Sequence, residues 1–184
     1  VCYTISRSVT SGSFYTGVDT VCDNATFTDT GVVNGVTYYY EVAAFDLAGL
    51  QGNFSPPGNC TQDASPPVTT LMPVPAAPNG AGGWYTSAVN ITLEAKDNTS
   101  GAAWTEYSID GGPFAEGVSL TIGSEGVHTV SFRSGDSVGN VEEPGSAEIR
   151  IDLTPPVAVM SIPKSAYVNT TVQFDGSAST DALG

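Results

Sequence analysis

Apolar and polar residues alternate along much of the chain. Val89, Ile91 and Leu93 occupy every second position of one stretch, and Val130 and Phe132 repeat the pattern further on. A period of two is typical of strands that bury one face, because successive side chains point to opposite sides of a sheet. Turns rich in glycine separate these stretches, and no stretch combines helical apolar spacing with capping residues. The pattern predicts an all-β chain of short strands.

The tripeptide Pro-Pro-Val occurs twice and divides the chain. The copies begin at Pro66 and Pro155, a spacing of 89 positions that suits one β-sandwich domain of about 100 residues. Consecutive prolines lack backbone N–H donors and hold the chain extended, so they favour a stiff connection over a strand interior. The repeat predicts a complete domain at 66–153, with 1–65 and 154–184 belonging to further units.

The middle segment, 66–153, carries several patterns of one domain type. They are Gly83-Trp84-Tyr85-Thr86-Ser87, Val89-Asn90-Ile91-Thr92-Leu93, Thr105-Glu106-Tyr107-Ser108-Ile109-Asp110-Gly111-Gly112, Glu125-Gly126-Val127-His128-Thr129-Val130-Ser131-Phe132-Arg133 and Asp136-Ser137-Val138-Gly139-Asn140. With these patterns the segment resembles a bacterial or archaeal extracellular immunoglobulin-like repeat. The resemblance implies a complete sandwich of about seven strands.

The first segment, 1–65, resembles the second half of a fibronectin type III domain. The resemblance is carried by Tyr3-Thr4-Ile5-Ser6-Arg7, Ala25-Thr26-Phe27-Thr28-Asp29-Thr30-Gly31 and Asn34-Gly35-Val36-Thr37-Tyr38-Tyr39-Tyr40-Glu41-Val42-Ala43-Ala44-Phe45-Asp46. The first strands of that family have no counterpart here. We therefore expect this segment to expose a sheet face and an edge.

The last segment, 154–184, resembles the opening strands that the first segment lacks. Pro156-Val157-Ala158-Val159 and Val172-Gln173-Phe174-Asp175-Gly176-Ser177 are similar to the start of a polycystic-kidney-disease-type or fibronectin-type sandwich. Three interpretations stay open. The chain is a piece of a longer tandem array, its two ends pair within one molecule, or the last strands of one subunit complete the first sheet of the next in a head-to-tail filament.

The negative net charge of the chain limits the kinds of partner that it can bind. Nineteen acidic against five basic residues give a formal net charge of −14. This balance argues against binding to nucleic acid or to an anionic membrane. No apolar run approaches the roughly 20 residues of a membrane-spanning helix, so we expect no membrane insertion. The chain opens on a strand-like sequence without Met, which predicts a mature product or an excised piece.

Asparagine usage predicts an extracellular glycoprotein. Six of the nine asparagines begin an Asn-X-Ser/Thr acceptor: Asn24, Asn53, Asn59, Asn90, Asn98 and Asn169. The alternative is that a composition rich in threonine produces such triplets without modification.

The three cysteines lie in the first segment. A hairpin turning at residues 9–13 would bring Cys2 and Cys22 opposite each other, and we favour this disulfide. Pairing of Cys22 with Cys60 is the alternative, and either choice leaves an odd thiol.

The sequence offers no catalytic constellation. His128, the only histidine, lies in a strand pattern, where a structural role is expected rather than one between a serine and a carboxylate. Glu142 and Glu143 are adjacent, so on a strand they point to opposite faces and form no acid–base pair. We predict that the chain is not an enzyme.

Two binding sites are candidates. Asp97, Asp136 and Glu142 lie in or beside turns and could supply hard oxygen ligands to calcium, although such residues also cap backbone amides. No other cofactor is expected. A sugar-binding aromatic platform could be formed by Trp84, Tyr85 and Trp104, unless these rings belong to the core.

These features predict tandem immunoglobulin-like/fibronectin type III-like β-sandwiches in a non-catalytic structural protein of the cell surface. It would be a subunit of a filament, a surface layer or an adhesin stalk, with neighbouring copies of itself and surface glycans as partners. The alternative function is an accessory spacer or carbohydrate-binding module of a secreted hydrolase.

Overall fold

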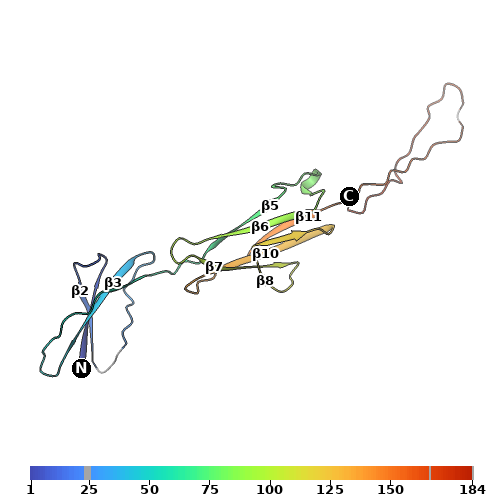
Figure 1. Ribbon diagram of the computed structural model, residues 1–184. Coiled ribbons are helices and arrows are strands. Elements are labelled where there is room, and N and C mark those ends of the chain that lie inside the picture. Colours follow the sequence, from blue (N-terminus) through green and yellow to red (C-terminus); the bar gives the residue numbers. More distant parts are fainter. Residues whose placement is uncertain (23–25, 166, 184) are drawn as a thin grey trace. The chain divides into compact units, whose positions relative to one another are not determined.

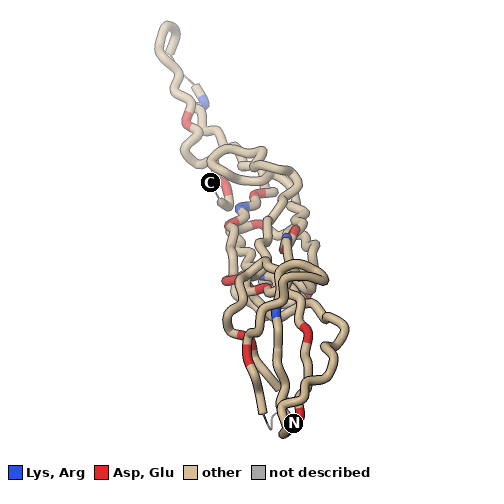
Figure 2. The backbone as a smooth tube through the Cα atoms, turned by 90° about the vertical axis from the view of Figure 1, so that its left-hand side faces the viewer, with Lys and Arg blue, Asp and Glu red and all other residues tan. Residues whose placement is uncertain are grey.

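The computed structural model describes residues 1–22, 26–165 and 167–183, and its regular secondary structure is almost entirely antiparallel strand (Figure 1). This confirms the all-β fold class. The described residues contain one short 3-10 helix, Ala81–Gly83, and no helix that is long and apolar enough to cross a membrane. Acidic residues are spread along the chain and basic residues are few (Figure 2).

The chain divides into two units. Unit 1 comprises Val1–Pro67, Asp97–Ala102 and Asp136–Asn140, and unit 2 comprises Val68–Lys96, Ala103–Gly135 and Val141–Gly184.

Unit 2 is a sandwich of two sheets. Its strands are β5 (Val68–Val74), β6 (Val89–Lys96), β7 (Ala102–Ile109), β8 (Ala115–Glu116), β9 (Ser119–Ile122), β10 (Gly126–Asp136) and β11 (Gly145–Ile151). One sheet has the order β5-β6-β9 and the other the order β11-β10-β7-β8. The end residues Ala102 of β7 and Asp136 of β10 are counted with unit 1. This arrangement confirms the immunoglobulin-like sandwich that the middle segment predicts.

The core of unit 2 lies between these sheets. The alternation in β6 places Val89, Ile91 and Leu93 inward, where they pack with Val130 of β10 and Ile151 of β11. Burial of an aliphatic side chain of this size contributes about 1.5–3 kcal/mol to the free energy of unfolding. The period of two in the sequence therefore identifies the residues that hold the sandwich closed.

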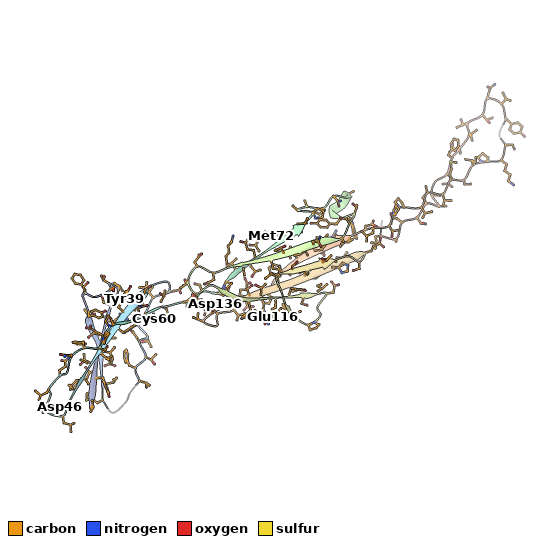
Figure 3. All side chains as sticks on the ribbon, viewed as in Figure 1. Tyr39, Asp46, Cys60, Met72, Glu116 and Asp136 are labelled. Atoms are coloured by element: carbon orange, nitrogen blue, oxygen red, sulfur yellow. A yellow bond between two sulfur atoms is a disulfide. The ribbon has the colours of Figure 1, made fainter. Side chains whose placement is uncertain are left out.

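Unit 1 contains a single sheet within its described residues. Its strands are β1 (Cys2–Ser8), β2 (Thr16–Cys22), β3 (Thr37–Phe45) and β4 (Gly58–Thr61), in the order β2-β1-β3-β4. Cys2 lies opposite Cys22 in the antiparallel pair β1–β2, and the two form a disulfide, which confirms the favoured pairing. Cys60 is a free, exposed thiol on β4 (Figure 3).

The two four-stranded sheets follow the same plan. If β1, β2, β3 and β4 are matched to β7, β8, β10 and β11, the order β2-β1-β3-β4 of one sheet corresponds to the order β8-β7-β10-β11 of the other. Residues 26–33 follow β2 as β9 follows β8, but they belong to no strand. Strands equivalent to β5 and β6 are absent from the described part of unit 1.

Residues 154–184 are counted with unit 2, and their described residues, 154–165 and 167–183, form no extended strand. In their described part, isolated antiparallel bridges join Val157 to Thr180 and Ser161 to Asp175, so the segment doubles back as an open hairpin. Most of its side chains are exposed.

Candidate functional site

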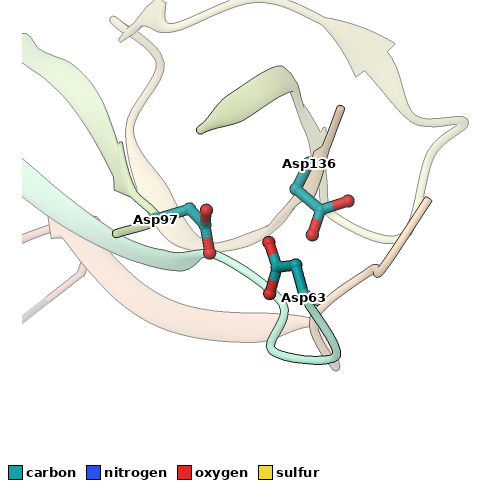
Figure 4. A group of neighbouring side chains, drawn as sticks. All are labelled: Asp63, Asp97 and Asp136. Carbon is teal, nitrogen blue, oxygen red and sulfur yellow. The ribbon is translucent and has the colours of Figure 1, made fainter. Parts of the chain in front are cut away.

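Three aspartates of unit 1 converge on one small region. Asp63 follows β4, Asp97 follows β6, and Asp136 is the last residue of β10. One carboxylate oxygen from each lies within 4.8 Å of the others (Figure 4). Among the described residues, this is the acidic group with the spacing of a cation site. The sequence predicted Asp97 and Asp136 as ligands but missed Asp63.

The turn that follows each strand orients Asp97 and Asp136. Asp97 Oδ1 accepts hydrogen bonds from the backbone N–H groups of residues 99, 100 and 101, at 3.0, 2.9 and 2.7 Å. Asp136 Oδ1 accepts from those of residues 138, 139 and 140, at 3.0, 2.7 and 2.8 Å. Both carboxylates therefore cap their own turns, as aspartates in this position commonly do.

The pKa of Asp136 reflects two opposing causes. Its side chain is buried, which by itself raises the pKa of a carboxyl group. Hydrogen bonds from the side chain and backbone of Asn140, and from the N–H groups of Val138 and Gly139, outweigh the burial and lower the pKa below its ordinary value. Asp136 thus carries its negative charge at neutral pH.

Asp63 connects the segment after β4 to both turns. Its Oδ2 accepts from the backbone N–H of Ser100 at 3.1 Å, and its Oδ1 accepts from that of Ser65 at 3.0 Å. Asn140 Nδ2 donates to the Asp63 carbonyl at 3.4 Å. The signal that could have identified Asp63 is its position just before Pro66-Pro67, but no local pattern connects it to the other two aspartates.

Glu142, the third predicted ligand, lies outside this cluster. Its carboxylate accepts from the Thr69 backbone N–H at 3.0 Å and from the Thr69 hydroxyl group, which also contacts the buried Ser134 hydroxyl at 2.6 Å. Glu142 thus closes a polar network inside unit 2. The structure therefore separates Glu142 from Asp97 and Asp136 and groups Asp63 with them instead.

The cluster suits a hard cation. Calcium prefers six to eight oxygen ligands, mostly carboxylate and carbonyl, and three carboxylates supply part of such a set. In addition, the Ser100 hydroxyl oxygen is buried without a hydrogen-bond partner among the described residues. The backbone N–H of the same serine donates to both Asp63 and Asp97.

A serine, a histidine and an aspartate meet in unit 2, which the sequence did not predict. His128 Nδ1 lies 2.8 Å from Asp110 Oδ2, and His128 Nε2 lies 3.1 Å from both the hydroxyl and the carbonyl oxygen of Ser124. The hydrogen bond to Asp110 is the main cause that raises the pKa of His128, and it lowers the pKa of Asp110.

This trio does not have the geometry of a nucleophilic triad. A general base must offer a free lone pair to the serine hydroxyl, whereas Nε2 also faces a carbonyl oxygen, which can only accept a hydrogen bond. The raised pKa favours the imidazolium, which donates from both nitrogens. His128 therefore ties the Asp110 turn to the Ser124 turn and serves a structural role.

The predicted sugar-binding platform is not formed. Tyr85 is buried in the core of unit 2 at 4% exposure, so it cannot present its ring to a sugar, and this assignment is corrected. Trp84 is half-buried, and Trp104 is half-buried with its ring against the backbone of Gly135.

The glycosylation acceptors lie on the surface where the structure describes them. The exposed ones are Asn53, Asn59, Asn90, Asn98 and Asn169. Asn24 lies outside the described residues. This exposure permits modification, and glycosylation itself stays a prediction.

Comparison with known proteins finds similarity both by sequence and by structure. No family model matches the chain. Exoglucanase B of Cellulomonas fimi is 30% identical over 195 residues, and the match covers 96% of this chain but 18% of that protein. Among solved structures, the fibronectin(III)-like modules of Clostridium thermocellum CbhA are similar with a TM-score of 0.40 and 18% identity, over 80% of this chain and 77% of that one. The chain therefore spans less than a fifth of its curated relative.

Proposed function

We propose that the chain is a non-catalytic spacer region of a secreted polysaccharide hydrolase. The observation that carries this proposal is the match to exoglucanase B, which takes in nearly all of this chain but 18% of the enzyme. A region of that extent, made of β-sheet units, is the size of a pair of accessory domains. Function in the extracellular space belongs to the same proposal.

The mechanism of a spacer is mechanical. Antiparallel sheets keep their length because their backbone hydrogen bonds run between neighbouring strands. The Cys2–Cys22 disulfide closes one hairpin of unit 1, and Pro66-Pro67 restricts the backbone between β4 and β5. Such a region holds a catalytic domain at a more uniform distance from a substrate-bound domain than a flexible linker does.

Direct carbohydrate binding is less well supported. Tyr85 is buried, and Trp84 and Trp104 are each half-buried, so the three rings do not form an exposed platform. A cell-surface filament or stalk has no support from the sequence relative, whose name is that of an exoglucanase.

The spacer function can be tested by exchanging this chain for a flexible linker in a two-domain cellulase. The chain is placed between a cellulase catalytic domain and a cellulose-binding domain, and compared with a Gly/Ser linker of the same number of residues. We expect higher activity on insoluble cellulose and equal activity on a soluble oligosaccharide. Equal activity on both substrates would contradict the proposal. Retention of the isolated chain on cellulose would favour a carbohydrate-binding module, and hydrolysis by it would show an enzyme.

A second candidate function is calcium binding at Asp63, Asp97 and Asp136. It is supported by the convergence of three carboxylates and by the buried, unpartnered Ser100 hydroxyl. A bound cation would join the segment after β4 to the two turns more tightly than hydrogen bonds alone.

A further inference from the structure

The side chain of Asn34 binds the chain directly after Asp63. Asn34 Oδ1 accepts a hydrogen bond from the backbone N–H of Ala64 at 2.7 Å, and Asn34 Nδ2 donates to the Ser65 hydroxyl oxygen at 2.6 Å. Ala64 and Ser65 are the two residues that follow Asp63, and all four residues belong to unit 1. Asn34 therefore fixes the backbone and a side chain immediately beyond this aspartate.

The neighbours of Asn34 in the same turn hold the chain before Asp63. The backbone N–H of Gly35 donates to the Gln62 carbonyl at 2.8 Å, and the Gln62 N–H donates to the Val36 carbonyl at 3.1 Å. Asp63 lies between β4 and β5, so no strand pairing orders it. The turn at 34–36 thus holds the backbone on both sides of Asp63.

The turn itself does not need asparagine at position 34. Gly35 has the positive φ, 76°, whereas Asn34 is not among the described residues that have a positive φ. The backbone N–H of Val36 closes the turn on the Val33 carbonyl at 3.2 Å. Neither feature uses the Asn34 side chain, which is therefore available to bind the segment after Asp63.

The cluster of Asp63, Asp97 and Asp136 keeps ligand capacity that the described residues leave unused. Among these residues, Asp97 Oδ2 accepts no hydrogen bond, and the buried Ser100 hydroxyl has no partner. The Ser100 N–H donates to both Asp63 and Asp97, so this serine lies beside both carboxylates. The ion pairs that Lys and Arg form in the described part of the chain involve other carboxylates. A bound cation would offset the repulsion among the three aspartates.

We propose that Asn34 is a positioning residue of this cation site: it holds Asp63 in place as a ligand and so sets the affinity of the cluster for calcium. This role rests on the second candidate function, calcium binding, and goes beyond it because Asn34 supplies no atom to the ion. Ordering an unpaired segment at the moment of binding would cost affinity. The two hydrogen bonds of Asn34 order the segment before the ion binds.

Calcium and the Asn34 contacts should stabilise each other. If Asn34 raises the affinity for calcium by some factor, bound calcium strengthens the Asn34 contacts by the same factor, because coupling between two equilibria is reciprocal. Exchange of the Ala64 amide hydrogen, which Asn34 Oδ1 accepts, should therefore slow when calcium binds.

Calorimetric titration with calcium tests the proposal. The full chain, treated with a chelator, is compared with Asn34→Ala, Asn79→Ala and Asp97→Asn at a temperature well below unfolding. Asn79 is the matched control, because it also precedes a glycine and its Oδ1 accepts from the Thr86 N–H at 2.8 Å, but it lies in unit 2. We expect Asn34→Ala to raise the Kd for calcium about tenfold, as loss of a hydrogen bond to a metal ligand's surroundings commonly does. Asn79→Ala should bind as the parent does, and Asp97→Asn should not bind.

A purely structural role for Asn34 predicts a different result. Asn34→Ala would then lower the melting temperature without calcium but leave the Kd for calcium unchanged. The conservative variant Asn34→Asp still offers oxygens to the Ala64 N–H and to the Ser65 hydroxyl, so it should bind calcium more tightly than Asn34→Ala does. Calcium should slow exchange of the Ala64 amide in the parent chain and have little effect on it in Asn34→Ala.

Two results would overturn the proposal, and they can be told apart. If the parent chain binds no calcium, or binds it as Asp97→Asn does, calcium binding at the cluster fails and the role of Asn34 fails with it. If the parent binds calcium and Asp97→Asn does not, but Asn34→Ala has the same Kd as the parent or as Asn79→Ala, the cation site stands and Asn34 does not position it.

Discussion

His128 Nδ1 and Asp110 Oδ2 lie 2.8 Å apart in unit 2 and connect β10 to the turn that follows β7. The His128 side chain is 13% exposed and that of Asp110 48%. Asp110 Oδ1 also accepts from the Thr129 backbone N–H at 2.8 Å, and Asp110 has a positive φ of 53°. The contact therefore stabilises a backbone conformation that is uncommon for a residue other than glycine.

This contact makes the stability of unit 2 depend on pH. The pKa of His128 is raised above its unfolded value of about 6.5, so its contribution is complete below that pH and is lost as pH rises through the folded pKa. The pKa of Asp110 is lowered, so its contribution is present above about 3.9 and is lost as pH falls through the folded pKa. We expect the pair to stabilise most between about pH 4 and 6.5.

NMR can measure this directly, because the chain contains one histidine. The imidazole signal should titrate above pH 6.5 in the parent chain and at lower pH in Asp110→Asn. That variant should also lose thermal stability at pH 5.5 more than at pH 9. An unchanged histidine pKa in Asp110→Asn would show that the contact does not form in solution.

Calcium should stabilise the chain through the cluster of Asp63, Asp97 and Asp136. After treatment with a chelator, added calcium should raise the melting temperature more than magnesium, because calcium accepts carboxylate ligands in irregular geometry whereas magnesium demands a near-ideal octahedron. Asp97→Asn and Asp136→Asn remove a charge but keep an oxygen that can cap the turn, so they should abolish the response to calcium.

Asp46→Asn is the matched control for the calcium experiment. Asp46 Oδ1 caps a turn through the N–H groups of Ala48 and Leu50, at 2.8 and 3.0 Å, but Asp46 is not part of the cluster (Figure 3). This variant should respond to calcium as the parent does. Equal responses in all variants would mean that the three aspartates act only as turn caps.

Gly135 should not tolerate a methyl group. A Cβ added there would overlap the Trp104 ring, which rests on the glycine backbone. We expect Gly135→Ala to lower the free energy of unfolding by about 1–3 kcal/mol, as overpacking does. Gly123→Ala is the control, since its nearest neighbour would be the Ala88 Cβ at 3.9 Å. Chemical denaturation of both variants measures this loss of stability. Equal denaturation midpoints for the two variants would contradict the prediction.

The Cys2–Cys22 disulfide should stabilise unit 1, whereas the free Cys60 thiol should contribute little to its stability. Loss of the Cys2–Cys22 bond, with a sequence separation of 20, is expected to cost about 2–4 kcal/mol. Cys60→Ser, at an exposed position, should change little. Comparing Cys2→Ser plus Cys22→Ser with Cys60→Ser by thermal unfolding tests this, and a larger loss from Cys60→Ser would contradict it.

Local sequence patterns were sufficient to predict the core strands of the sandwich and the disulfide of the first hairpin. The alternation of Val89, Ile91 and Leu93 follows from the pleat of a single strand, and the pairing of Cys2 with Cys22 follows from one turn between adjacent strands. Both depend on residues close in sequence. The grouping of the candidate site residues was predicted less well, since the structure places Asp63 rather than Glu142 beside Asp97 and Asp136 and buries Tyr85 in the core.

Sequence alone determined the all-β class, the strands of the sandwich core and the Cys2–Cys22 bond, because these depend on periodicity and on neighbouring strands. Tertiary structure decided that Asp63 joins Asp97 and Asp136, that Glu142 binds Thr69, and that Asp110 meets His128. Those contacts join residues 18 to 73 positions apart. Their partners are set by how strands from distant parts of the chain are ordered in a sheet, and no local spacing encodes that order.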